Sequence, residues 1–294
     1  IDAIGKLLIT ARDKYGVDVD YFSFNEANYG VNFLFTPDTI DQFVRQAGPA
    51  FAKLGLETKF LVGDTTGGAP FPAYVQTLIH DPAVAQYLGP LAFHCWDALE
   101  VSDDTYSQIA AIGRSTGKPI YCTEGGWDSA LWQRENALPS WDNALHTAQA
   151  YAKTLRLSGA STIDYWTYED NYPIVSEDGQ HPYPVFNVIQ QIGETFPKGC
   201  HIVGSTSSTS DIEEVVSVGP ERGEMSMMIV DTSGAADVTV SGLPPGLAFA
   251  GIEMHDGGIV IHAAPPYEVS ASGKIEVQMP ARSVMILTCH PEVK

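Results

Sequence analysis

The sequence has 294 residues, 44% of them hydrophobic, a composition that is typical of globular proteins and argues against disorder. Its 16 Lys and Arg stand against 36 Asp and Glu, which gives a formal net charge of −20. This charge argues against nucleic acids and anionic membranes as partners, because both need a basic surface, and it favours a neutral partner.

The first 16 residues are predicted to form an amphipathic helix. Their apolar side chains fall on one stripe, made of Ile1, Ile4, Leu7, Leu8, Ala11 and Tyr15. No signal peptide is visible, and no apolar run is long enough to cross a bilayer. The chain therefore starts inside a folded element, so either an upstream segment has been removed or it was never part of this chain.

Residues 17 to 198 are predicted to contain five strand-then-helix units. The predicted strands cover residues 17–24, 57–63, 89–96, 118–124 and 160–168. The predicted helices cover residues 36–54, 71–80 with 82–89, 103–115, 140–157 and 183–196. Short apolar strands that alternate with helices indicate a parallel sheet, either open or closed into a barrel. The stretch "VGDTTGGAP" has neither the Lys-Ser/Thr ending of a P-loop nor the GxGxxG pattern, so nucleotide binding is disfavoured.

Residues 199–294 have a different character, with short β-prone runs separated by Gly, Pro, Ser and Asp. This spacing is typical of an antiparallel sandwich, in which "SVMILT" is apolar on both faces, as a central strand would be. We therefore predict an α/β domain over residues 1–198 and an all-β sandwich domain over residues 199–294. The four cysteines form no CxxC pair, and Cys200 and Cys289 are either a disulfide or reduced thiols.

Side chains suited to catalysis follow the predicted strands of the α/β domain. The carboxyl ends of parallel strands lie at the active-site edge of a β/α barrel. In chain order these ends carry Asn25, Glu26, Asp64, His94, Trp96, Glu124, Trp127, Trp166 and Tyr168. Aromatic faces at the mouth of a pocket suit the apolar faces of sugar rings, so this inventory favours a carbohydrate site.

Glu26 and Glu124 are the candidate catalytic pair. Glycoside hydrolysis needs one carboxyl group to protonate the leaving oxygen and another to attack the anomeric carbon. The run "YFSFNEAN" gives Glu26 an apolar surround, and His94 or Tyr168 would help to hold Glu124 ionised. A lone Glu at a strand end is more often a solvated loop residue. Two such residues, each flanked by aromatic side chains, favour catalysis.

A metal-dependent hydrolase is disfavoured. His94 and Asp97 are three residues apart, so on a strand they would face opposite ways, and no second His lies at a predicted strand end. We expect neither a metal nor a cofactor.

The motifs "FNEAN" and, three strand units later, "TEGGW" resemble those of clan A of the glycoside hydrolases. In that clan an Asn-Glu pair ends the fourth barrel strand and carries the acid/base, and a second Glu ends the seventh strand and is the nucleophile. The appended sandwich and a Trp that ends the eighth strand make family 30 the best match, and families 5 and 39 stay open.

The resemblance implies a retaining β-glycosidase with Glu26 as acid/base and Glu124 as nucleophile, about 5–5.5 Å apart. Asn25 resembles the residue that binds the sugar 2-hydroxyl, Trp166 the aromatic floor of the cleaved sugar's subsite, and His94 a residue near the nucleophile. Further substrate-binding candidates are Trp96, Trp127, Asp64 and Tyr168. Packing below the site is the alternative for Trp96, capping of a turn the alternative for Asp64, and a place in the wall of the site the alternative for Tyr168.

The resemblance also implies a partial (β/α)8 barrel, because a chain whose Glu26 ends strand four supplies only strands four to eight. The chain is then either a fragment of a longer enzyme or a genuine partial barrel. A genuine partial barrel has an open side, which predicts a homo-oligomer that covers it. The expected partner is a neutral oligo- or polysaccharide, or an aryl or alkyl glycoside, and the resemblance favours a secreted or periplasmic location. The alternative function is a carbohydrate-binding or structural module with a degenerate, inactive barrel.

Overall fold

The computed structural model describes residues 1–221 and 223–289, so parts of the predicted domain 199–294 (residues 222 and 290–294) lie outside the described residues. The chain forms two compact units. The first unit comprises Ile1–Gly125 and Leu157–Asp164, and the second comprises Gly126–Arg156 and the chain from Tyr165 onward. In the described part of the chain, no helix has both the length and the apolar character needed to cross a membrane.

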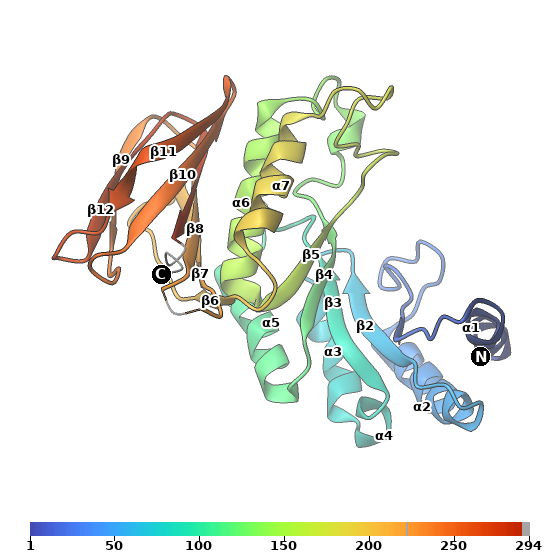
Figure 1. Cartoon of the computed structure of the whole chain (residues 1–294). Coiled ribbons are helices and arrows are strands. Elements are labelled where there is room, and N and C mark those ends of the chain that lie inside the picture. Colours follow the sequence, from blue (N-terminus) through green and yellow to red (C-terminus); the bar gives the residue numbers. More distant parts are fainter. Residues whose placement is uncertain (222, 290–294) are drawn as a thin grey trace. The chain divides into compact units, whose positions relative to one another are not determined.

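The first unit is built on a five-stranded parallel sheet, which confirms the predicted α/β class (Figure 1). The strands pair in chain order, as consecutive β/α units do. They are β1 (Tyr21–Phe22), β2 (Lys59–Thr65), β3 (Leu88–His94), β4 (Ile120–Gly125) and β5 (Ala160–Tyr165). Strand β1 is shorter than the predicted run of residues 17–24, because only two of its residues pair with β2.

The helices begin and end close to the predicted positions, except that the helix predicted over residues 82–89 ends at Ala85, because Leu88 already begins the next strand. They are α1 (Asp2–Tyr15), α2 (Pro37–Lys53), α3 (Phe71–His80), α4 (Pro82–Ala85), α5 (Asp103–Thr116), α6 (Trp141–Ser158) and α7 (Pro184–Thr195). Thr36 is the N-cap of α2, since its hydroxyl accepts a hydrogen bond from the Thr39 N–H at 3.2 Å. In the first unit, α3 packs against its neighbours α2 and α5 and against strands β2 and β3 (Figure 1).

Strands β2 and β3 are buried along almost their whole length, as in the middle of a parallel sheet covered on both faces. The core residues of β2, β3 and β4 include Phe60, Val62, Leu91, Phe93, Ile120 and Cys122. This burial fixes the register of the three strands, and therefore also the positions at which they end.

The second unit contains a six-stranded antiparallel sheet of order β11-β10-β13-β8-β7-β6 and a two-stranded sheet of β12 and β9. The strands are β6 (His201–Val203), β7 (Ile212–Val218), β8 (Met225–Asp231), β9 (Ala236–Ser241), β10 (Ala248–His255), β11 (Gly258–Glu268), β12 (Lys274–Met279) and β13 (Ser283–Cys289). As predicted from "SVMILT", β13 is a central strand. Both sheets contribute to one apolar core that includes Met227, Phe249, Val277, Met285 and Leu287.

Two helices belong to the second unit together with the sandwich strands. Helix α7 packs against β8 and β13, and Arg156, near the end of α6, forms an ion pair with Glu213 of β7. The division of the chain at residue 198 remains a prediction.

Gly63 and Asp64 in β2 have positive φ values, 93° and 45°, and the pairing of β2 with β3 is irregular there. A Cβ atom at Gly63 would lie 2.4 Å from the carbonyl oxygen of Ala92 and 2.9 Å from the ring of Phe71. We therefore expect Gly63→Ala to lower the free energy of unfolding by about 2–4 kcal/mol, measured by urea denaturation.

Gly117→Ala is the matched control for this prediction. Gly117 also has a positive φ, 65°, but its Cβ would meet no atom within 4 Å, so it should lose only about 1 kcal/mol. An equal loss at both positions would contradict the role of the close approach at Gly63.

Candidate active site

The first unit brings six of the predicted site residues to one edge of its sheet. They come from β2, β3 and β4 and from the segments just after β1 and β3, and they are Asn25, Glu26, Asp64, His94, Trp96 and Glu124. Direct contacts link all six. The carboxyl ends of the strands therefore form one polar cluster, as the sequence predicted for the edge of a parallel sheet.

His94 is the centre of the cluster and has no exposed surface. Its Nδ1 atom lies 3.3 Å from Glu26 Oε1 and 3.2 Å from Glu124 Oε2, and its Nε2 atom lies 3.4 Å from Asp64 Oδ1. Burial alone would lower the pKa of His94, but the three carboxylates outweigh it and raise the pKa to about 9. The imidazole is therefore a cation at neutral pH.

This charge makes a pH-dependent contribution to stability. The pKa of His94 is raised from 6.5 to about 9 on folding, so the contribution is complete below pH 6.5 and is lost as the pH rises through 9. It amounts to about 3 kcal/mol. Urea denaturation at pH 6 and pH 10 should show this loss in the wild type and not in His94→Gln. Equal losses in both proteins would contradict it.

Glu124 accepts hydrogen bonds on both of its oxygens. Asn25 Nδ2 donates to Oε1 at 3.1 Å, and Trp96 Nε1 donates to Oε2 at 3.2 Å. Burial raises the pKa of Glu124 above its ordinary value, and the charge of His94 together with these two donors offsets this shift only in part. Donors on a carboxylate stabilise its charged form, which is the form that a nucleophile needs. Trp96 therefore contacts the cluster through its N–H group.

Glu26 adopts a left-handed backbone conformation with φ of 49°, and its N–H donates to the carbonyl oxygen of Asp64 at 2.9 Å. One oxygen of Glu26, one oxygen of Glu124 and one ring nitrogen of His94 all lie within 4.8 Å of one another. This spacing would suit a metal ion, but an ion bound there would have to displace the proton of His94.

Asp64 is held by two hydroxyl groups that the sequence prediction did not include. Ser23 Oγ donates to Oδ2 at 2.6 Å, and Thr123 Oγ1 donates to Oδ1 at 2.5 Å. Burial opposes ionisation of Asp64, but the adjacent His94 ring and the hydrogen bonds from Ser23 and Thr123 outweigh it and lower the pKa of Asp64. Ser23 had a sequence signal, since it stands two residues before Asn25 and therefore on the same face of an extended segment. Thr123 directly precedes Glu124.

Two buried thiols lie beneath the cluster. Cys95 and Cys122 have no exposed surface, and Cys122 Sγ donates to the Glu124 carbonyl oxygen at 3.4 Å. Burial raises the pKa of Cys122. All four cysteines of the chain are free thiols, so Cys200 and Cys289 form no disulfide.

The other three predicted site residues belong to the second unit. Trp127 stacks on His146, with ring centroids 4.5 Å apart, and its N–H donates to Asn143 at 3.0 Å. These contacts are those of a packed side chain. Trp166 and Tyr168 are exposed, by 41% and 61%, and so present aromatic faces to solvent.

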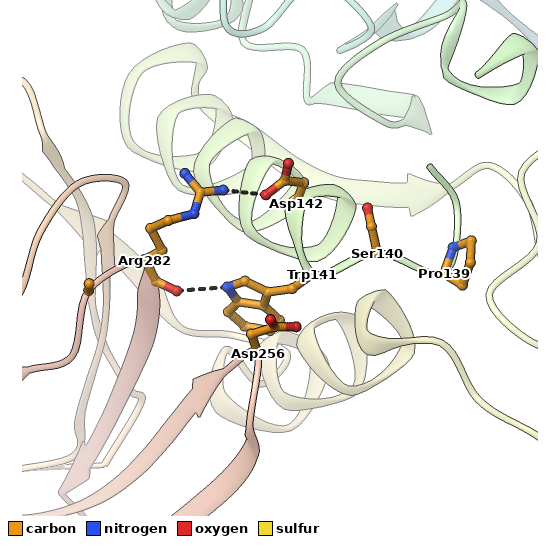
Figure 2. Close-up of a pocket in the computed structure, with 7 residues that line it drawn as sticks. Pro139, Ser140, Trp141, Asp142, Asp256 and Arg282 are labelled. Carbon is orange, nitrogen blue, oxygen red and sulfur yellow. Dashed lines mark hydrogen bonds and ion pairs between the residues drawn. The ribbon is translucent and has the colours of Figure 1, made fainter. Parts of the chain in front are cut away.

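The second unit also contains a cavity of about 390 Å³, shown in Figure 2. It is lined by Pro139, Ser140, Trp141, Asp142, Asp256, Ala281 and Arg282. The Trp141 N–H donates to the Arg282 carbonyl oxygen at 2.7 Å, and the Arg282 guanidinium pairs with Asp142. Because Trp141 is only 8% exposed, its ring offers little surface for a sugar to stack on.

Comparisons with known proteins identify the fold. No protein-family model and no curated protein matches the sequence. Among solved structures, the chain is similar to a family 30 endoxylanase from Clostridium papyrosolvens C71, with a TM-score of 0.76 and 12% identity over 98% of this chain and 71% of that chain. It is also similar to a family 30 subfamily 8 xylanase from Clostridium acetobutylicum, with a TM-score of 0.77 and 16% identity over 99% of this chain and 72% of that chain. A third similar structure is a family 44 xyloglucanase from Paenibacillus polymyxa, with a TM-score of 0.64 and 11% identity over 98% of this chain and 70% of that chain.

The chain therefore has the fold of the clan A glycoside hydrolases. Within that clan the fold is close to that of family 30, as the motifs at Asn25, Glu26 and Glu124 predicted.

Proposed function

We propose that the protein is a retaining β-glycosidase that hydrolyses O-glycosidic bonds of a neutral saccharide. The observation that carries the proposal is the pair of carboxylates, Glu26 and Glu124, whose facing oxygens lie within 4.8 Å of each other across His94. Retaining enzymes hold their two carboxyl groups about 5–5.5 Å apart, and inverting enzymes about 6.5–9.5 Å apart. Two oxygens within 4.8 Å of each other are compatible with the shorter, retaining range and so with a double displacement.

In this proposal Glu124 attacks the anomeric carbon while Glu26 protonates the departing oxygen. Glu26 then removes a proton from water, which attacks the same carbon and releases Glu124. The donors from Asn25 and Trp96 keep the Glu124 carboxylate charged and oriented before the attack. The positive charge of His94 lies between the two carboxylates and reduces their mutual repulsion.

The proposed substrate is a neutral, β-linked oligo- or polysaccharide. The similar structures are described as xylanases, as a bifunctional glucanase-xylanase and as a xyloglucanase. The net charge of −20 is compatible with a neutral ligand. Trp166, which is partly exposed, is the proposed floor of the sugar subsite, and Tyr168 is a further contact.

The five parallel strands are proposed to correspond to barrel strands four to eight, in a catalytic domain of residues 1–198 that precedes the sandwich domain. Strand β1 is then the open edge of a partial barrel, and its Tyr21 is exposed. A homo-oligomer that covers this edge is proposed, and a stable monomer in sedimentation at micromolar concentration would contradict it. A secreted or periplasmic location is also proposed, and one similar protein is described as exported.

Hydrolysis of a panel of aryl β-glycosides tests the function. Turnover should be found with at least one of the xyloside, glucoside, galactoside or fucoside, and proton NMR should show the β-anomer of the sugar as the first product. The α-anomer would exclude a retaining mechanism. Saccharide binding without turnover would support the alternative, an inactive carbohydrate-binding module.

A further inference from the structure

Asp64 is buried within the candidate site, with 5% of its surface exposed. Its left-handed backbone conformation follows Gly63 in the irregular part of β2. Asp tolerates this conformation better than most residues other than glycine, but it remains uncommon outside turns. A buried carboxylate in such a position has little surface left for a substrate, although the sequence suggested it as a substrate contact.

Both carboxylate oxygens of Asp64 are engaged in contacts within the protein. The hydroxyls of Ser23 and Thr123 bind its two oxygens, and Oδ1 also faces the Nε2 atom of His94 at 3.4 Å. The two hydroxyls hold the carboxylate from β4 and from the segment after β1. The third contact of the carboxylate is with the imidazole ring of His94.

The main chain of Asp64 is hydrogen-bonded to Glu26, the proposed acid/base. Its carbonyl oxygen accepts the N–H of Glu26, the residue with the second left-handed conformation in the site. The same residue therefore holds the backbone of Glu26 and faces the ring of His94. The opposite nitrogen of that ring, Nδ1, faces Glu26 and Glu124 at 3.3 and 3.2 Å.

We propose that Asp64 is a positioning residue that acts through His94 and fixes the orientation and the protonation of the ring, so that Nδ1–H stays between the two catalytic carboxylates. A carboxylate beside one imidazole nitrogen holds a proton on that nitrogen and favours the doubly protonated ring, in which the other nitrogen also carries a proton. Without the Asp64 carboxylate, the buried Nε2 side of the ring loses the negative charge that faces it at 3.4 Å. This inference rests on the proposed glycosidase function.

Asp64→Asn tests the proposal, because Asn keeps the volume and tolerates positive φ, while it removes the charge and replaces one acceptor oxygen with an amide donor. The expected result is a kcat about 10- to 100-fold lower with KM changed by less than about threefold. A substrate contact would instead raise KM at constant kcat. The Nδ1 and Nε2 resonances of His94, assigned with His94→Gln, should shift, and the upper limb of the pH profile of kcat/KM should move.

Asp97→Asn is the matched control. Asp97 is also a strand-end carboxylate that binds two groups, the N–H groups of Gly68 and Ala69 at 2.8 and 3.0 Å, but both are main-chain groups of the loop after β2. This variant should lose thermal stability and keep the wild-type kcat and His94 resonances. Thr123→Val, which removes one donor from Asp64, should show a smaller kcat loss of the same kind, and it decides the question if Asp64→Asn does not fold.

The outcomes separate the two proposals. If the wild type hydrolyses no glycoside, the proposed function fails, while the shift of the His94 resonances in Asp64→Asn still tests the link between Asp64 and His94. If the wild type is active but Asp64→Asn, or Thr123→Val in its place, keeps both kcat and the His94 resonances, Asp64 is only a structural cap and the positioning role is overturned.

Discussion

Replacing Glu124 by Ala should lower kcat on aryl β-glycosides by a factor on the order of 10⁴ or more. The proposed nucleophile has no substitute within the cluster, because the nearest other carboxylate, Glu26, is needed as the acid/base. Thermal stability should fall, since the variant leaves the buried His94 cation and the Asn25 and Trp96 donors without this carboxylate. Rates in single-turnover experiments with an activated substrate check this expectation.

Azide gives a sharper test of the role of Glu124. In Glu124→Ala the small anion can enter the space of the lost carboxylate and attack the anomeric carbon once, which inverts the configuration and yields the α-glycosyl azide. Glu57→Gln, at an exposed position in the first unit, is the matched control and should keep full activity. Near-wild-type turnover of Glu124→Ala, or a β-azide product, would show that Glu124 is not the nucleophile.

Replacing Glu26 by Ala should have a large effect that depends on the leaving group. General acid catalysis contributes about 10²–10⁴-fold to a rate, so hydrolysis of substrates with a poor leaving group should fall by that factor. A dinitrophenyl leaving group needs no protonation, so formation of the glycosyl-enzyme should stay fast and the intermediate should accumulate as a burst.

Azide should then rescue Glu26→Ala with the opposite stereochemistry. Attack of the anion on the accumulated intermediate is the second of two inversions, so the product is the β-glycosyl azide. An equal loss of rate for good and poor leaving groups would contradict the role of Glu26 as the acid. Together, the two variants assign the two carboxylates independently of any single rate constant.

The sequence predicted the first unit well because burial there follows a simple pattern. Continuous apolar runs became β2, β3 and β4, and polar residues stand where those runs end, so that His94, Glu124 and Asp64 had to meet at one edge of the sheet. Caps such as Thr36 placed the helices for similarly local reasons. The two carboxylates therefore came together as expected.

Other features depend on tertiary contacts that no local pattern contains. Strand β10 contains Gly251 and Glu253 and forms because it lies between β11 and the central strand β13. The left-handed conformation of Glu26 arises in the loop after β1, and that of Asp64 arises where the pairing of β2 with β3 is irregular. Neither conformation could be predicted from the residue type alone. The roles of the Ser23 and Thr123 hydroxyls could not be predicted, because they depend on the buried Asp64 carboxylate that lies between them in the fold.

The two thiols under the candidate site have a practical consequence for measuring its motion. Cys95 and Cys122 have no exposed surface, so an alkylating reagent reaches them only when the packing around β3 and β4 opens locally. The rate of alkylation then gives the free energy of that local opening, without any introduced probe. A ligand that bridges the carboxylates above them would bind only the closed form and slow the reaction in proportion to its occupancy. Protection of these thiols would thus report saccharide binding even in variants that no longer turn over.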